Sequence, residues 1–335
     1  MLSITMTVTV IVVVLALIFD FINGFHDTAN AIATSVSTRV LTPRQAIIMS
    51  AVLNLVGAFV SVTVAKTVGA DLVNPSSIPQ TVIIAALLGA IAWNLITWYF
   101  GIPSSSSHAI IGGLLGAAIV YKGSFSIVNW TNLYSKVILW MFLSVIIGFV
   151  LGYIFMTALN WMLRPERPET VTKVFSKLQI VSAAAMALNH GANDAQKSMG
   201  IITMAMVSGG LMSEFTVPFW VKVACALAMA LGTSVGGWKI IKTMGLNMAR
   251  LTPVNGFAAE TSAAAIILTA TLLHAPVSTT HIISTSIMGV GASKRLSSVK
   301  WIVAKNIVWT WVITIPVSAA MSGLFIILIE KIFQH

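Results

Sequence analysis

Charged residues are scarce in this chain. Only 8% of its 335 residues are Asp, Glu, Lys or Arg, whereas 57% are hydrophobic; soluble globular domains carry roughly a quarter charged residues. The mean hydropathy of +0.95 leaves too little polar surface to cover a core of this size. An ordinary soluble domain is therefore excluded, and the sequence predicts an all-α polytopic membrane protein with short loops.

Cysteine is almost absent. The single Cys225 cannot form an internal disulfide, and no group of Cys and His has the spacing of metal ligands, so no structural metal and no bound cofactor are expected. The net charge of +10 would suit nucleic acid only if it formed a basic face. The Lys and Arg residues lie between apolar runs instead, which indicates a role in membrane topology and no nucleic-acid partner.

Ten apolar runs divide evenly between the two halves of the chain. They fall at about 7–37, 46–65, 82–100, 108–121, 137–163, 178–208, 217–236, 254–274, 281–292 and 301–329. Polar motifs recur in both halves, with Asp27 matching Asp194 and His108 matching His281. An internal repeat of half the chain explains this pattern most simply.

A charged, proline-bearing stretch separates the fifth apolar run from the sixth. We therefore predict a first membrane repeat at 1–163, a cytoplasmic linker at 164–177 and a second membrane repeat at 178–335. Five crossings is an odd number, so two such repeats joined directly are inverted relative to each other. Inverted repeats are typical of secondary transporters, whose sites lie between the repeats near the bilayer midplane.

The distribution of basic residues gives an independent test of this topology. With the N-terminus outside, the inner loops hold 13 Lys and Arg and the outer segments hold four, as the positive-inside rule requires. Both termini are therefore expected outside the cell (cytoplasmic) membrane.

Two apolar runs are too long for a simple crossing and carry a carboxylate at their centre. Residues 7–37 would extend about 45 Å as a helix, against about 30 Å of hydrocarbon. Such a segment must tilt strongly or break. We expect a break at 23–30, around Asp27, and a matching arrangement at 189–197, around Asp194. Intramembrane carboxylates are functional candidates by default, and two facing broken helices would bring both acids into one cavity.

Two short apolar runs begin at proline and hydroxyl clusters. The sequences PSSSSH at 103–108 and PVSTTH at 276–281 precede runs of only 14 and 12 residues, which are too short to span alone. The clusters are therefore expected inside the membrane, as starts of half-helices whose free N–H groups favour an oxyanion such as phosphate. The hydroxyls concerned belong to Ser104, Ser105, Ser106, Ser107, Ser278, Thr279 and Thr280.

The acids and the hydroxyls demand different ligands. An anion held by the half-helices is repelled by Asp27 and Asp194, by several kcal/mol at short range in a partly dry cavity. Na⁺ or protons at the carboxylates remove this repulsion, so that anion and cation favour each other's binding. This reciprocity predicts symport by alternating access.

Further polar residues are expected to line the same cavity. Asp20 and Asn23 precede Asp27 by seven and four residues and so share its helix face. His26 and His190 flank the acidic motifs, where they either orient the carboxylates or take part in coupling. The remaining candidates are Asn193 at the coupling site and Gln196, His108 and His281 as lining residues. For His108 and His281, the two alternatives are proton transfer and a capping or packing role.

Several motifs resemble the inorganic phosphate transporter (PiT) family of cation-coupled symporters. The matching segments are NGFHDTANAIATSV, HGANDAQKSMGI, PSSSSHAIIGG, PVSTTH and GFAAE, which occur in order across both halves. The resemblance implies uptake of inorganic phosphate driven by Na⁺ or H⁺, both termini outside and a homodimer. Arsenate, as a shape mimic, is expected to be taken up as well.

The family's functional residues can be carried over by position. Its DxxN motif falls on Asp27 and Asn30 and its second aspartate on Asp194, which together form the possible Na⁺ sites. Its hydroxyl clusters form the phosphate cradle. Its intramembrane glutamate falls on Glu260, for which a solvated position near the inner interface is the alternative.

One residue departs from the family pattern. Lys197 stands where many members repeat the asparagine of DxxN. Its ammonium would replace one bound cation or contact phosphate directly. Coupling to Na⁺, coupling to H⁺, and uptake of a neutral metal–phosphate complex with H⁺ therefore all stay open.

Other functions fit the sequence less well. Ser106 near His108 suggests an intramembrane hydrolase, but no GxSxG-like elbow surrounds the serine, and duplicated motifs serve no purpose for a single nucleophile. An anion channel would favour a cationic or neutral lining over two acids. Among transported anions, sulfate or another oxyanion is the nearest alternative to phosphate. We therefore predict a transporter and not an enzyme.

Overall fold

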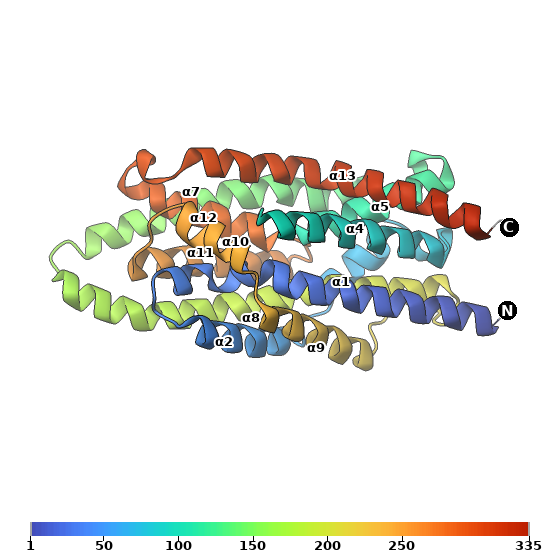
Figure 1. The fold of residues 1–335 in the computed structure, drawn as a ribbon, viewed down its shortest axis with the longest axis horizontal. Coiled ribbons are helices and arrows are strands. Elements are labelled where there is room, and N and C mark those ends of the chain that lie inside the picture. The colour runs from blue at the N-terminus through green and yellow to red at the C-terminus, as the bar shows by residue number, and fades with distance from the viewer. Residues whose placement is uncertain (1, 334–335) are drawn as a thin grey trace.

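The structure is a computed structural model that describes residues 2–333 as a bundle of helices (Figure 1). The first half contains α1 (Leu2–Ser37), α2 (Pro43–Gly57), α3 (Thr63–Lys66), η1 (Thr67–Asp71), η2 (Pro75–Ser77), α4 (Gln80–Phe100), α5 (Ser106–Lys122), η3 (Phe125–Ile127), α6 (Trp130–Asn132), η4 (Leu133–Ile138) and α7 (Leu139–Met162). The second half contains α8 (Pro168–Ser208), α9 (Phe219–Val235), α10 (Trp238–Lys242), η5 (Thr243–Asn247), α11 (Pro253–Leu272), α12 (Thr279–Lys294), η6 (Leu296–Ser298) and α13 (Trp301–Phe333).

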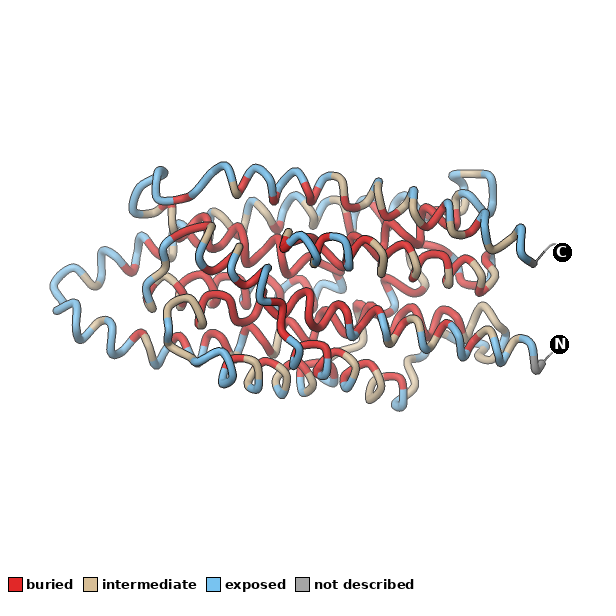
Figure 2. The backbone as a smooth tube through the Cα atoms, viewed as in Figure 1, coloured by how far each residue is buried: buried red, intermediate tan, exposed pale blue. Residues whose placement is uncertain are grey.

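Several of these helices are long and apolar enough to cross a membrane. Five qualify among the described residues, namely α1, α4, the continuous stretch 130–162, α8 and α13, and the bent pair α9 with α10–η5 makes up to six. Exposed residues follow the outer faces and ends of the bundle, while the centre is buried (Figure 2). Many of the exposed residues are large and apolar, such as Phe142 and Trp309. The prediction of an all-α polytopic membrane protein is confirmed.

The breaks predicted at 23–30 and 189–197 are wrong. Both segments lie inside uninterrupted helices, α1 of 36 residues and α8 of 41 residues. Asp27 and Asp194 find hydrogen-bond partners within their own helices and on the half-helices, as described below, so the backbone does not need to unwind. Gly24 serves close packing instead, because a Cβ there would collide with the backbone carbonyl of Met229 on α9.

The broken helices occur at two corresponding places elsewhere. α2 ends at Gly57 and the chain turns helical again in α3 and η1. In the second half, α9 ends at Val235 and the following helix is bent by 63° from it. Gly236 makes this bend with a φ of +75°, a conformation that L side chains rarely adopt. The same interruption thus recurs once in each half.

The short half-helices begin where the hydroxyl clusters predict. α5 starts at Ser106 and α12 at Thr279, and both are buried over most of their length. Ser105 caps α5 by accepting the amide of His108 at 3.2 Å, and Ser278 caps α12 by accepting the amide of His281 at 3.3 Å. One serine of each cluster therefore satisfies the helix start itself.

The two halves are inverted. The corresponding helices α1 and α8 pack together and run in opposite directions (Figure 1). The described ends of α1 and α13 lie at one end of the molecule, and the turn between α7 and α8 lies at the other. This arrangement confirms the prediction of two inverted repeats. Residues 168–177 of the predicted linker form the first turns of α8.

Close contact between α5 and α13 depends on Gly116. A Cβ at this position would lie 2.5 Å from the Cα of Ala319 on α13, a distance at which one backbone must move. We expect Gly116→Ala to lower stability by about 1–3 kcal/mol, as overpacking does, with a clear drop in melting temperature in detergent. Gly323→Ala is the matched control, because its nearest neighbour is a methyl group of Val120 at 3.0 Å. Equal melting temperatures for the two variants would contradict this view of the interface.

Candidate functional site

The mirrored acids and the mirrored half-helices meet at the centre of the bundle. The Ser106 hydroxyl, in the first turn of α5, donates to Asp27 Oδ2 at 2.7 Å. In the second repeat, the Thr279 hydroxyl, at the start of α12, lies 3.4 Å from Asp194 Oδ2. None of these four residues is more than 2% exposed. Each carboxylate therefore faces the half-helix of its own repeat in an enclosed environment.

Asn30 joins the two repeats. Its amide, on α1, donates to the hydroxyls of Thr279 at 3.1 Å and Thr280 at 2.9 Å. Its Oδ1 is buried without a hydrogen-bond partner among residues 2–333. A buried carbonyl oxygen without a donor is a ready ligand for a cation. The two residues of the DxxN motif thus contact different half-helices, Asp27 that of the first repeat and Asn30 that of the second.

The first carboxylate is held by its neighbours on α1. His26 Nδ1 lies 2.7 Å from Asp27 Oδ1, and its Nε2 contacts the hydroxyls of Thr97 at 3.0 Å and Ser104 at 3.2 Å. Asn23 Oδ1 lies 2.6 Å from the same Ser106 hydroxyl that Asp27 contacts. Of the two roles left open for His26, this geometry favours orientation of the carboxylate.

The second carboxylate is paired with a buried lysine. Lys197 Nζ donates to Asp194 Oδ1 at 2.5 Å, and both side chains are fully buried. His190 Nε2 lies 3.5 Å from Asp194 Oδ2, and its Nδ1 contacts Asn54 at 3.2 Å. Because a buried charge is stable only with a partner, Asp194 and Lys197 depend on each other.

The two aspartates belong to one cluster. Asp27, His190 and Asp194 each offer one ligand atom, and these atoms lie within 4.8 Å of one another. Carboxylate oxygens suit Na⁺ and other hard cations. This cluster can therefore hold a cation beside the hydroxyls of Ser106 and Thr279.

Glu260 lies in a separate polar cluster. It is fully buried on α11, which excludes the alternative of a solvated interface position. It accepts hydrogen bonds from Thr34 and Ser182, and from Gln179 Nε2 at 3.2 Å. Thr34 lies two helical turns, about 10 Å, beyond Asp27 on α1. Neither Thr34 nor Ser182 was among the candidates from the sequence. Thr34 lies seven residues after Asp27 and so on the same helix face, which could have indicated it, but no sequence pattern indicates Ser182.

Gln196 and Asn193 of α8 form hydrogen bonds to other elements of the bundle. Gln196 Oε1 accepts the amides of Val64 at 2.7 Å and Ala65 at 3.2 Å, and so caps the broken helix α3. Asn193 Nδ2 donates to the Thr271 hydroxyl at 2.9 Å. It occupies the same place in α8 as His26 in α1, which contacts Thr97 in the matching helix.

The remaining candidates surround the centre. Ser107 donates to the Val277 carbonyl at 3.0 Å, next to the start of α12. Asp20 is fully buried, with the Ser198 hydroxyl of α8 beside its carboxylate. The rings of His108 and His281 meet edge to face at 4.7 Å, which supports the packing role for this pair.

A helical membrane protein with two inverted repeats and buried acids facing half-helix starts has the architecture of a secondary transporter. The sequence matches the profile of the phosphate transporter family over residues 23–170 and 163–322. The chain therefore belongs to the phosphate transporter family, and the resemblance noted from its motifs is confirmed. It is a transporter and not an enzyme, as predicted.

Individual relatives agree with this assignment. A probable low-affinity inorganic phosphate transporter of Bacillus subtilis (strain 168) is 54% identical over 94% of this chain and 95% of its own length. A protein of the same description from Rhizobium meliloti (strain 1021) is 49% identical over 91% and 92% of the two chains. Among solved structures, the sodium-dependent phosphate transporter superposes with a TM-score of 0.87 at 25% identity, covering 97% of this chain and 100% of the other.

Proposed function

We propose that this protein carries inorganic phosphate across the cell membrane together with a cation, by alternating access. The observation that carries the proposal is the shared location of Asp27, Asp194 and the hydroxyl-bearing starts of α5 and α12. The relatives described as inorganic phosphate transporters support the choice of substrate. The test below also distinguishes phosphate from sulfate and other oxyanions as the transported anion.

The electrostatics of the centre make the cation necessary. Phosphate bound at Ser106 and Thr279 lies beside two carboxylates, of which only Asp194 has a lysine partner. A cation near Asp27 offsets the remaining repulsion, so each ligand raises the affinity for the other. The hydroxyls and half-helix amides then supply donors to the phosphate oxygens.

Na⁺ is the coupling ion that the site supports best. Asp27, Asp194 and the Oδ1 of Asn30, which has no partner within residues 2–333, are oxygen ligands of the kind that hard cations prefer. The structural relative is described as sodium-dependent, which points the same way. Lys197 already supplies one positive charge, so we infer that fewer cations accompany phosphate than in a centre with two asparagines.

Uptake into proteoliposomes tests the proposal directly. Radiolabelled phosphate uptake should require an inward Na⁺ gradient, should compete with arsenate and should resist excess sulfate. Dependence on a pH gradient alone would assign the coupling to protons, and a requirement for a divalent metal would assign it to a metal–phosphate complex. Flux independent of every cation gradient would refute symport.

Replacement of the lysine in the centre tests the role of its charge. Lys197→Asn recreates the residue that Asn30 supplies in the first repeat. This variant leaves Asp194 unpaired unless a cation binds there. We therefore expect it to be less stable without Na⁺ and to take up phosphate with a steeper dependence on Na⁺ concentration, because one fixed positive charge must be replaced. Lys222→Asn on α9, a membrane lysine outside the centre, is the matched control and should behave like wild type. An unchanged Na⁺ and pH dependence in Lys197→Asn would reject this role.

The assembly and sidedness of the protein are also part of the proposal. We infer that both termini face outward, since the two described chain ends lie opposite the turn between the repeats and the basic loops require the inside. Accessibility of a terminal tag in intact cells checks this orientation.

The homodimer is proposed from the family resemblance. Light scattering of the protein in detergent, which gives the mass of the assembly, tests it.

A further inference from the structure

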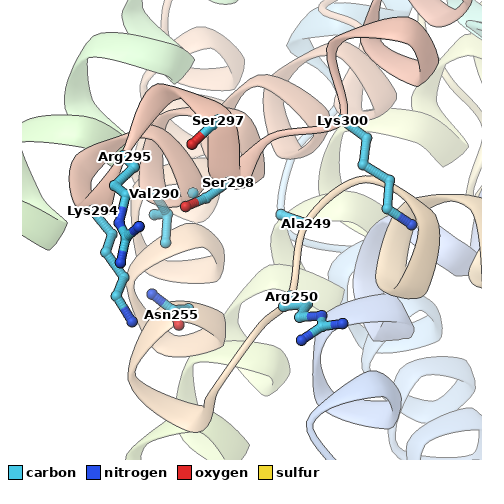
Figure 3. A pocket seen from close by; sticks show the side chains of 10 residues that line it. Ala249, Arg250, Asn255, Val290, Lys294, Arg295, Ser297, Ser298 and Lys300 are labelled. Atoms are coloured by element: carbon cyan, nitrogen blue, oxygen red, sulfur yellow. The ribbon is translucent and has the colours of Figure 1, made fainter.

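Four basic residues line a single cavity (Figure 3). The cavity has a volume of about 390 Å³, and the four are Arg250, Lys294, Arg295 and Lys300. Lys294 and Arg295 lie on one side of it and Arg250 and Lys300 on the other, as Figure 3 shows. The rest of the lining contains the polar side chains of Asn255, Ser297 and Ser298 and no acidic residue.

The positive charge of this cavity is not compensated. Within the part of the chain that the structure describes, none of the four basic side chains forms an ion pair, and all four are exposed. Glu166 lines an adjoining cavity that shares Lys294 and Asn255. An exposed group of cations without acids attracts anions from the surrounding solution or membrane surface.

The other repeat contains the same backbone arrangement. The amide of Lys300 donates to the Met248 carbonyl at 3.0 Å, and the amide of Asn129 donates to the Leu72 carbonyl at 2.9 Å. An isolated β-bridge lies next to each of these hydrogen bonds, and a 3₁₀ turn precedes each. The two loops are therefore equivalent in fold.

They differ in charge. In the order Arg250, Lys294, Arg295 and Lys300, the corresponding residues of the first repeat are Asn74, Gly123, Ser124 and Asn129. All four are neutral, so this loop structure forms without the basic residues. A bias of basic residues toward the inner side would favour charge anywhere in the inner loops, whereas here the charges surround one cavity.

We propose that this cavity binds a phosphate-bearing anion at the cytoplasmic surface, apart from the transport centre. Arginine forks match phosphate oxygens bidentately, and lysines, hydroxyls and the Asn255 amide supply further donors. The inference rests on the proposed orientation of the protein, but not on the coupling ion. The cavity would be a second anion site, in addition to the phosphate site that transport requires.

The phosphate group can come from two sources. Leu296 and Trp301, beside the cavity, are 66% and 47% exposed, which places the cavity near the membrane interface, where exposed tryptophan is common. A soluble phosphoanion from the cytoplasm and the headgroup of an acidic phospholipid both reach this position. They offer the same chemistry to the four basic residues.

Two triple variants of the full-length protein distinguish anion binding at the cavity from a general effect of positive charge on the inner side of the membrane. The cavity variant is Arg250→Gln, Lys294→Gln and Arg295→Gln. The matched variant is Arg44→Gln, Arg164→Gln and Lys173→Gln, which removes three exposed basic residues of the inner side that do not line the cavity. Both keep the transport centre intact, so a difference between them reports the cavity alone.

The first measurement uses inorganic pyrophosphate as a soluble probe, titrated calorimetrically against protein in lipid-free detergent. The second uses native mass spectrometry to count phosphatidylglycerol retained from nanodiscs of phosphatidylcholine with phosphatidylglycerol. We expect the cavity variant to lose at least about tenfold in affinity or retention relative to both wild type and the matched variant, since each Lys or Arg near a surface contributes about 1 kcal/mol.

A loss seen only with pyrophosphate identifies a soluble phosphoanion, and a loss seen only with phosphatidylglycerol identifies a lipid headgroup. Equal behaviour of the two triple variants in both measurements would overturn the proposal. Failure of the transport proposal alone leaves these results unchanged, because neither measurement depends on phosphate uptake.

Discussion

Asp27→Asn should reduce Na⁺-driven phosphate uptake by at least about 100-fold while the protein stays folded. The substitution keeps the size of the side chain and removes the one carboxylate of the centre that has no lysine partner. Losing one partner of a buried charge interaction costs about 2–5 kcal/mol, and 2.8 kcal/mol corresponds to about 100-fold. The measurement is initial uptake of radiolabelled phosphate into proteoliposomes at matched protein content.

Asp71→Asn is the matched control for this substitution. Asp71 pairs with Lys136 at 2.7 Å, away from the centre, and both side chains are partly exposed. A surface ion pair of this kind contributes about 1 kcal/mol or less, so uptake should stay near the wild-type rate. Near-normal uptake by Asp27→Asn would remove the basis for cation coupling at this carboxylate.

Lys197→Met should destabilise the protein by about 3–5 kcal/mol, because it leaves the buried Asp194 without its partner. The double variant Asp194→Asn with Lys197→Met should recover most of this stability, since neither charge is then unpaired, but it should not recover uptake. Unfolding by denaturant in detergent measures the first effect and proteoliposome uptake the second.

Lys136→Met provides the comparison for an exposed lysine and should cost about 1 kcal/mol or less. A double variant as unstable as Lys197→Met alone would show that the two residues do not stabilise each other.

By the same reasoning, Asp194→Asn alone leaves a buried ammonium unpaired. It should therefore lower both stability and uptake, whereas Asp27→Asn lowers uptake only.

The sequence indicated which residues gather at the centre, because charge in an apolar run is costly. Asp27, Asp194 and the hydroxyl clusters stand out against their surroundings for this reason, and duplication predicted that they meet. The internal repeat also predicted inversion, since five apolar runs in each half leave no other orientation.

The sequence did not predict where the helices break. A glycine beside polar residues is typical of an unwound segment, but Gly24 packs against α9 within a continuous helix. That distinction depends on tertiary contacts. The same is true of Glu260, whose partners Thr34 and Ser182 lie on two other helices, and of Gln196, whose capping of α3 joins residues far apart in the chain.

The pairing of Lys197 with Asp194 has a consequence for the unloaded carrier. A centre with two unpaired acids would carry two negative charges through the membrane field each time it reoriented without substrate. Here the lysine cancels one of them within the same helix. One elementary charge crossing 100 mV corresponds to about 2.3 kcal/mol. If transport proceeds by the alternating access proposed above, we therefore expect the return step of the empty carrier to be less sensitive to membrane voltage.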